Sequence, residues 1–309
     1  MRELRRPRPA IDPWRPLDVV REAEHGREGL REETLTVFLA GMECPFTCVF
    51  CDLWRHTLGT PTPAGALPRQ LDLALARAAG GLPVDRVKLY NASNFFHPGA
   101  VPPADDEELA RRLAAVPAVT VESHPRLLGD RCLRFAGLLD GRLEVAIGLE
   151  TAHRETLAGL GKQMTLDDFD RAADWLADHD LGLRVFVLVG VPGLAPEEQL
   201  EWVARSAAHA LSRGARRVAL IPVRGGNGAL EELAARGLFH PPTLDDLEAA
   251  LGRALAEAGG TVTADLWDLE RFSRCAQCLP ARRDRLEAMN RTGSDPGAVA
   301  CARCGGSAR

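Results

Sequence analysis

A regular alternation of short β-rich runs with amphipathic segments constrains the fold of this 309-residue chain most strongly. The β-rich runs are 35–39, 86–90, 118–121, 143–149, 183–189 and 217–221. Alanine-rich segments with helical periodicity, such as 70–79, 106–115, 166–177 and 197–211, lie between most of them. Strands joined through helices run parallel, because a parallel neighbour needs a crossover connection. The sequence therefore predicts an α/β protein with about six βα units.

The apolar character of these runs predicts how the sheet is covered. The strands are too apolar for one face to be solvated, so helices should cover the outer side. A curved sheet, or partial (β/α) barrel, is the simplest arrangement that satisfies this condition. In such a sheet we expect the functional residues just after the carboxyl ends of the strands.

Changes in composition divide the chain into three parts. Residues 1–33 are rich in proline and charge and predict an extended lead-in. Residues 34–266 carry the βα rhythm and form the predicted partial barrel. From residue 267 the rhythm stops, and residues 267–309 carry four cysteines. We expect this last part to be a small appended metal-binding module.

The overall composition, 46% hydrophobic and 26% charged, is typical of a soluble globular protein. No apolar run reaches the roughly 18 residues of a spanning helix, and the N-terminus does not resemble a signal peptide. We therefore expect a cytoplasmic protein with no membrane partner. Cysteines in that compartment stay reduced, so clustered cysteines favour metal binding over disulfides.

Three cysteines follow the first β-rich run with the spacing C-x3-C-x2-C. They are Cys44, Cys48 and Cys51. A structural zinc ion normally takes four ligands from paired knuckles, whereas three thiolates leave one position open. The trio therefore favours an iron–sulfur cluster with one open iron. A zinc site completed by His56, or buried structural cysteines, are the alternatives.

With Phe50 directly before the last cysteine, the trio resembles the signature of the radical S-adenosylmethionine (SAM) superfamily. The resemblance covers residues 34–260 and implies a partial barrel of six units. It also implies that Cys44, Cys48 and Cys51 hold a 4Fe–4S cluster whose open iron binds the methionine part of SAM. The implied reaction is reductive cleavage of SAM to a 5'-deoxyadenosyl radical, which abstracts hydrogen from substrate. An electron donor such as flavodoxin or ferredoxin is implied as a partner.

The same resemblance implies which residues contact the cofactor. They are Phe50, Asn91, Ala92, Ser93, Glu122, Ser123, Glu150, Lys162 and Gly190. The family has a glycine-rich turn after its second strand, whereas this chain has Asn91, Ala92 and Ser93 there, so backbone carbonyls would serve instead. Further polar residues are expected at the same mouth and are candidates for substrate binding. These are Asn94, His97, His124, Arg224 and Asn227.

The order of residues from Glu122 through Glu150 to Lys162 and Phe169 is most similar to one branch of the superfamily. That branch contains the Elongator catalytic subunit and the radical SAM subunit of archaeosine synthase, so the resemblance implies a tRNA nucleoside as substrate. One alternative is a radical SAM enzyme acting on a small molecule or peptide, with an auxiliary iron–sulfur cluster. A second alternative is a non-catalytic, zinc-binding nucleic-acid adaptor.

The four C-terminal cysteines form two knuckles. Cys275 and Cys278 make one C-x2-C pair, and Cys301 and Cys304 make the other. Four thiolates close a tetrahedron, which predicts either structural zinc or a second 4Fe–4S cluster with all positions filled. Residues 271–309 contain eight arginines against three acids. This excess favours a contact with tRNA, although a solvated arginine-rich surface gives the same composition.

Overall fold

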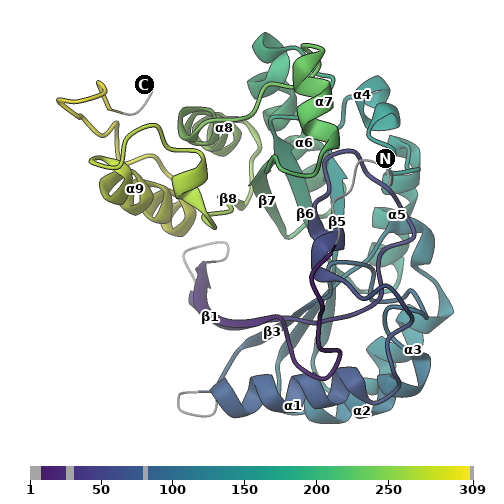
Figure 1. Ribbon diagram of the computed structural model, residues 1–309. Helices are drawn as coiled ribbons and strands as arrows, with labels where there is room; N and C mark the ends of the chain where they lie inside the picture. The colour runs from purple at the N-terminus through teal and green to yellow at the C-terminus, as the bar shows by residue number, and fades with distance from the viewer. Residues whose placement is uncertain (1–7, 26–30, 79–82, 307–309) are drawn as a thin grey trace.

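The computed structural model describes residues 8–25, 31–78 and 83–306 (Figure 1). Its strands form one eight-stranded sheet in chain order. They are β1 (Asp18–His25), β2 (Arg31–Phe38), β3 (Arg86–Tyr90), β4 (Ala118–Glu122), β5 (Arg142–Glu150), β6 (Gly182–Val189), β7 (Arg217–Pro222) and β8 (Val262–Ala264). β1 is antiparallel to β2, and every later pair is parallel. The predicted α/β class and partial barrel are confirmed.

Helices cover the outer side of the curled sheet, as Figure 1 shows. The helices of the described chain are α1 (Ala66–Ala78), α2 (Asp106–Arg112), α3 (Asp130–Leu138), α4 (Arg154–Gly159), α5 (Leu166–Asp178), α6 (Gln199–Ser212), α7 (Ala229–Ala235), α8 (Leu244–Glu257) and α9 (Leu279–Thr292), and α9 lies beyond β8. In α5, Leu166, Phe169 and Ala173 lie on one buried face, and Thr165 and Asp168 form a capping box at its start. None of the helices described is long and apolar enough to cross a membrane.

The two faces of the sheet differ in polarity. In β3, Val87 and Leu89 belong to the hydrophobic core, whereas Arg86 and Lys88 lie on the opposite, inner face. The strands are therefore not apolar throughout, contrary to the expectation from the sequence. The inner face needs no solvation because its charges pair with one another, as in the ion pair of Arg86 with Glu144 (3.2 Å).

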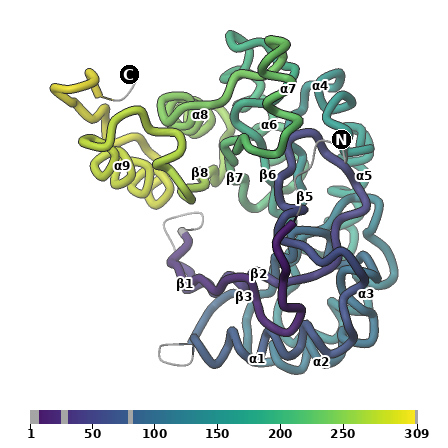
Figure 2. Tube along the Cα trace, in the orientation of Figure 1, coloured from purple at the N-terminus to yellow at the C-terminus, as the bar shows by residue number. Residues whose placement is uncertain are grey.

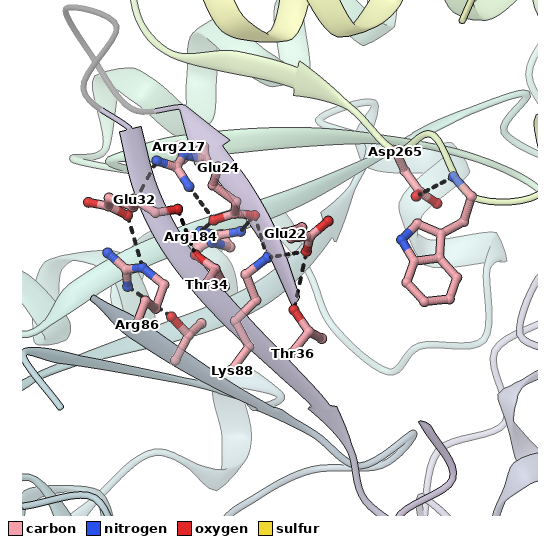
Figure 3. A network of polar contacts seen from close by, with 12 residues as sticks. Glu22, Glu24, Glu32, Thr34, Thr36, Arg86, Lys88, Arg184, Arg217 and Asp265 are labelled. Atoms are coloured by element: carbon pink, nitrogen blue, oxygen red, sulfur yellow. Dashed lines mark hydrogen bonds and ion pairs between the residues drawn. The ribbon is translucent and has the colours of Figure 1, made fainter. Parts of the chain in front are cut away.

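The N-terminal segment also differs from the predicted lead-in, because residues 18–25 form β1 at one edge of the sheet. The carboxylate of Glu24 pairs with Arg184 of β6 (2.7 Å) and Arg217 of β7 (2.5 Å). Figure 3 shows Glu24 between these arginines and Lys88. The sheet thus curls until β1 reaches β6 and β7, and ion pairs join them near the amino ends of the parallel strands.

The chain after β8 carries α9 and the four C-terminal cysteines, and Figure 2 shows this segment in yellow beyond β8. The guanidinium groups of Arg282 and Arg285 in α9 pair with the buried carboxylate of Glu248 in α8 (2.8 and 3.0 Å). Asn290 Nδ2 donates to the carbonyl of Ala264 in β8 (2.9 Å). These contacts attach the segment to the sheet.

Candidate metal centre at the mouth of the half-barrel

The three clustered cysteines lie on the loop that follows β2, at the carboxyl end of the parallel strands. Burial raises the pKa of Cys48 and of Cys51 to about 12, and it also raises the pKa of Cys44. These groups are therefore neutral thiols at pH 7 unless a cation stabilises the thiolate. A bound metal supplies that charge, since the thiolate is the ligand form. The donor set fits a thiolate-ligated metal centre.

Two distant segments hold this loop in place. The Val49 N–H donates to the Leu160 carbonyl (2.9 Å). Asn227 Nδ2 donates to the carbonyls of Val49 (2.8 Å) and Cys51 (3.3 Å), while its Oδ1 accepts the first backbone N–H groups of α7. Asn227, a predicted substrate ligand, is therefore an anchor of the cysteine loop.

Asn94 contacts a cysteine directly. Its Nδ2 donates to Cys44 Sγ (3.1 Å), and its Oδ1 accepts the His124 N–H (2.6 Å). The ring of Phe46, on the cysteine loop, stacks on His124 with centroids 3.9 Å apart. The structure thus brings together the predicted residues Asn94 and His124 and joins the ends of β3 and β4 to the loop.

The protonation state of His124 follows from its surroundings. Burial and the nearby Lys162 lower the pKa of His124 to about 4, so its ring is neutral at pH 7. Because Nδ1 accepts the Arg126 N–H (3.2 Å), the proton resides on Nε2. Nε2 then donates to the Lys162 carbonyl (3.1 Å), which ties the segment before α5 to the site.

A buried ion pair lies at an irregularity in β5. The strand register shifts between Gly148 and Glu150, and Glu150 has a φ of 67°, in the left-handed region. Lys162 Nζ donates to Glu150 Oε1 and to the Gly148 carbonyl, each at 2.5 Å. Burial alone would lower the pKa of Lys162, but the Glu150 carboxylate reverses this effect and the pKa is raised. A fixed positive charge therefore lies near Cys44 and Cys48.

Three polar groups at the ends of β3 and β4 have hydrogen-bonding capacity to spare. Asn91 Nδ2 and Ser93 Oγ are buried and have no partner in the part of the chain that the structure describes. Ala92 between them has a φ of 51°. Burial raises the pKa of Glu122 to about 7, although the carboxyl group receives a backbone hydrogen bond from Asn91. Unsatisfied buried groups cost about 1–3 kcal/mol each, and a polar ligand would satisfy them.

Some predicted cofactor residues have clear structural contacts. Gly190 has a φ of 81°, and a Cβ there would come within 2.7 Å of Pro242. Ser123 Oγ donates to the His124 carbonyl (3.2 Å), and Phe50 packs against the hydrophobic core. Gly190 and Ser123 are therefore buried, and Phe50 partly buried, by contacts within the chain.

Two predicted substrate ligands, Arg224 and His97, lie near residues outside the cysteine loop. Arg224 pairs with Asp265 (2.7 Å) and donates to the Trp267 carbonyl (2.8 Å), so its guanidinium group joins β7 to the chain after β8. His97 has a buried Nδ1, and burial together with Arg131 lowers its pKa. No contact with the cysteine loop is recorded for either side chain among the described residues.

The second cysteine group forms a compact cluster. The sulfur atoms of Cys275, Cys278, Cys301 and Cys304 all lie within 4.8 Å of one another. Cys275 and Cys301 are 4.0 Å apart, and Cys278 and Cys304 are 3.6 Å apart. The predicted pairing of the two knuckles into one four-cysteine cluster is confirmed.

Sequence reasoning missed two aromatic residues at the site. Phe46 lies inside the cysteine motif, and its position two residues after Cys44 was the available signal for its stacking on His124. Tyr90 ends β3, directly before the polar residues that were predicted, and its ring lies on the inner face of the sheet. The alternation of side chains along β3 could have predicted that Tyr90 lies on the inner face, because it follows Arg86 and Lys88 at intervals of two residues.

Comparison with known sequences gives a distant relative. No protein-family profile matches this chain. An uncharacterised protein of Methanocaldococcus jannaschii is 20% identical over 244 residues, which make up 75% of this chain and 65% of the relative. The chain thus spans less than two thirds of that protein.

Comparison with solved structures identifies the fold. A radical SAM methyltransferase from Sphaerobacter thermophilus is similar with a TM-score of 0.54 and 17% identity, over 82% of this chain and 77% of that one. Elp3 of Methanocaldococcus infernus gives a TM-score of 0.50 and 15% identity, over 63% and 51%. SuiB of Streptococcus suis, bound to its precursor peptide SuiA, gives 0.50 and 13%, over 74% and 48%.

These similarities place the architecture in one class, the α/β half-barrels of radical SAM enzymes. The fold is that of the radical SAM superfamily, as the resemblance of the cysteine motif implied. This chain spans about half the length of Elp3 and of SuiB.

Proposed function

We propose that the protein is a radical SAM enzyme and that Cys44, Cys48 and Cys51 hold a 4Fe–4S cluster. The observation that carries the proposal is the placement of three thiols on one loop at the mouth of a radical SAM half-barrel, with the Asn94 amide donating to Cys44. When bound, the cluster supplies the electron that cleaves SAM to methionine and a 5'-deoxyadenosyl radical, which abstracts hydrogen from substrate.

The surrounding side chains support this chemistry by charge and by hydrogen bonding. Lys162 is a fixed cation that offsets negative charge on the cysteine sulfurs. Three polar residues would contact the polar groups of SAM: Glu150, Asn91 and Ser93. Lys162 holds the carboxylate of Glu150 in place. Phe50, Ala92, Ser123 and Gly190 remain the proposed contacts on its other sides.

The test is the production of 5'-deoxyadenosine by protein reconstituted without oxygen, reduced with dithionite and given SAM. The Cys48→Ala variant should lose the product. Cys132→Ala is the matched control, because Cys132 is fully buried in α3 and belongs to neither cysteine group. Product from Cys48→Ala at the level of the native chain, or no iron at the loop of the native chain, would contradict the proposal and favour the zinc-binding adaptor.

For the substrate, we propose a tRNA nucleoside. The support is the order of polar residues from Glu122 to Phe169, which resembles the tRNA-acting branch. Exposed Arg274, Arg291 and Arg303 offer cations for phosphates, whereas Arg282 and Arg285 are buried against acids and contribute little to such a surface. Bulk tRNA should raise the yield of 5'-deoxyadenosine, and added salt should weaken the effect. A yield independent of tRNA would contradict this choice of substrate.

For the C-terminal site, we propose zinc. A tetrahedron with zinc–sulfur bonds of about 2.3 Å has sulfurs about 3.8 Å apart, close to the separations of 3.6 and 4.0 Å. In a 4Fe–4S cluster each thiolate binds a different iron, so the sulfurs lie further apart. A variant with all three loop cysteines replaced by alanine should retain one zinc per chain and no iron by elemental analysis. Iron in that variant would identify the site as an auxiliary cluster.

A further inference from the structure

The inner face of the sheet has two layers along the strand direction, and the lower one consists of ion pairs. Figure 3 shows these side chains between β1 and the parallel strands. Four cations face four carboxylates: Arg86, Lys88, Arg184 and Arg217 against Glu22, Glu24, Glu32 and Glu144. All four cations are buried, and each has two carboxylate partners. This lower layer therefore has no unpaired cation for a phosphate or carboxylate ligand.

The upper layer, nearer the cysteine loop, is aromatic and partly exposed. Tyr90 and Phe186 follow Lys88 and Arg184 of the lower layer by two positions, and Phe38 follows Thr36, which donates to Glu22 of that layer. The three rings therefore lie on the same face as the ion pairs. Tyr90 makes edge contacts with Phe38 and Phe186, at centroid distances of 6.2 and 6.1 Å. Trp267 adds a fourth ring, 5.3 Å from Phe38. All four side chains are partly or largely exposed, unlike the cations below them.

One acid belongs to this upper layer. Glu122 follows Thr120 on the inner face, and the register of β3 with β4 places it beside Tyr90. The carboxyl group receives a backbone N–H from Asn91, and Lys162 acts on it electrostatically without forming an ion pair with it among the described residues. Tyr90 Oη is buried and likewise has no partner within the described ranges. Hydrogen-bonding capacity is thus left over where the aromatic rings are accessible.

We infer that Phe38, Tyr90, Phe186 and Trp267, together with Glu122, form the substrate-recognition site, and that the group they recognise is a flat ring bearing an N–H donor, such as a nucleobase. Aromatic faces stack on a flat ring. At pH 8 Glu122 is mostly ionised, and its carboxylate accepts from a ring N–H. The cations of the lower layer are already paired with carboxylates, so they do not bind the phosphates of the substrate. The inference rests on the proposed function. It identifies the base of a nucleic-acid substrate as the group that the half-barrel would bind.

The first test compares two isosteric substitutions on neighbouring layers. Glu122→Gln should raise the apparent KM for bulk tRNA about tenfold, since a hydrogen bond to a charged acceptor is lost. Thr120→Val is the control, because Thr120 is paired with Arg86 and Glu144 below the site, and it should leave KM unchanged. Weaker SAM binding by Glu122→Gln with an unchanged KM for tRNA would assign Glu122 to the cofactor and overturn the inference.

The second test uses the fact that Tyr90 is the only tyrosine in the chain. Full-length, cluster-loaded protein containing 3-fluorotyrosine should give one fluorine NMR signal. It should shift on addition of bulk tRNA or of a mixture of adenosine, guanosine, cytidine and uridine. A signal moved by neither probe would overturn the inference, even where tRNA stimulates SAM cleavage. A signal moved by nucleosides, with no stimulation by tRNA, would support this site and contradict tRNA as the substrate.

Discussion

At the scale of single residues, Gly148 has no space for a larger side chain, because it lies against the buried Glu150–Lys162 ion pair. A Cβ there would collide with Glu150 Oε1 and would come within 2.5 Å of Lys162 Nζ. We expect Gly148→Ala to break the Glu150–Lys162 pair and to lower the free energy of unfolding by about 3 kcal/mol, as for other buried ion pairs that lose their geometry. Chemical denaturation of the apoprotein measures this loss.

Gly137→Ala is the matched control for that substitution. Gly137 is exposed in α3, and nothing lies within 4 Å of an added Cβ. Alanine in a helix is favoured over glycine by about 0.5–1 kcal/mol, so this variant should be slightly more stable than the native chain. Equal stability of the two variants would contradict the assigned role of Gly148.

Glu122 predicts a pH dependence of stability. Its pKa is raised from 4.5 to about 7 by burial, so between these values the folded state binds more protons than the unfolded state. Stability should therefore fall as pH rises through this window, by at most about 3 kcal/mol. Urea denaturation between pH 4.5 and 8 should show this fall in the native chain.

Glu122→Gln should remove that contribution, because glutamine does not titrate. The stability difference between the native chain and this variant should therefore change with pH, in favour of the variant at the alkaline end. A difference that is constant from pH 4.5 to 8 would show that the pKa of Glu122 is the same in the folded and the unfolded protein, contrary to the raised value.

At the scale of elements, the sequence predicted the parallel strands well and missed both terminal ones. The run 86–90 has the same bounds as β3, because its apolar residues alternate with side chains of the inner face. β1 contains Glu22 and Glu24, which indicate a solvated segment when considered locally. Their partners lie on β3, β6 and β7, and no local pattern shows a contact across 160 residues, such as that of Glu24 with Arg184.

At the site, the sequence predicted the clustered cysteines but not the residues that hold the cysteine loop in place. Motif spacing identified all seven clustered cysteines, because metal ligation imposes fixed intervals. The roles of Asn94 and Asn227 were not predictable, since both bind the cysteine loop from segments distant in the chain. A polar residue near a strand end can bind substrate or hold a loop, and only the folded contacts distinguish the two.

Glu24 should be the residue through which β1 stabilises the half-barrel. Glu24→Gln leaves Arg184, Arg217 and Lys88 without a shared carboxylate, so we expect a loss of about 3–5 kcal/mol in the free energy of unfolding. Glu257→Gln is the control, because its pair with Arg253 is exposed and contributes about 0.5 kcal/mol or less. Comparable losses in the two variants would contradict the structural role of β1.

At the scale of the whole molecule, the C-terminal segment and the half-barrel should respond differently to metal removal. The four-cysteine site has little apolar core of its own, so a bound metal would contribute folding energy locally. A chelator should therefore increase hydrogen exchange in residues 275–304 and leave the amides of β5 and β6 protected. Equal loss of protection in both parts would show that the metal stabilises the whole fold.

The loop of Cys44, Cys48 and Cys51 is proposed to hold a 4Fe–4S cluster with one iron open to SAM. Electron paramagnetic resonance of the reconstituted, dithionite-reduced protein tests it most directly, before any substrate is known. We expect the signal of a reduced 4Fe–4S cluster that changes on addition of SAM and disappears in Cys48→Ala. A signal that SAM leaves unchanged, or one of undiminished intensity in Cys48→Ala, would show that the loop holds no such cluster.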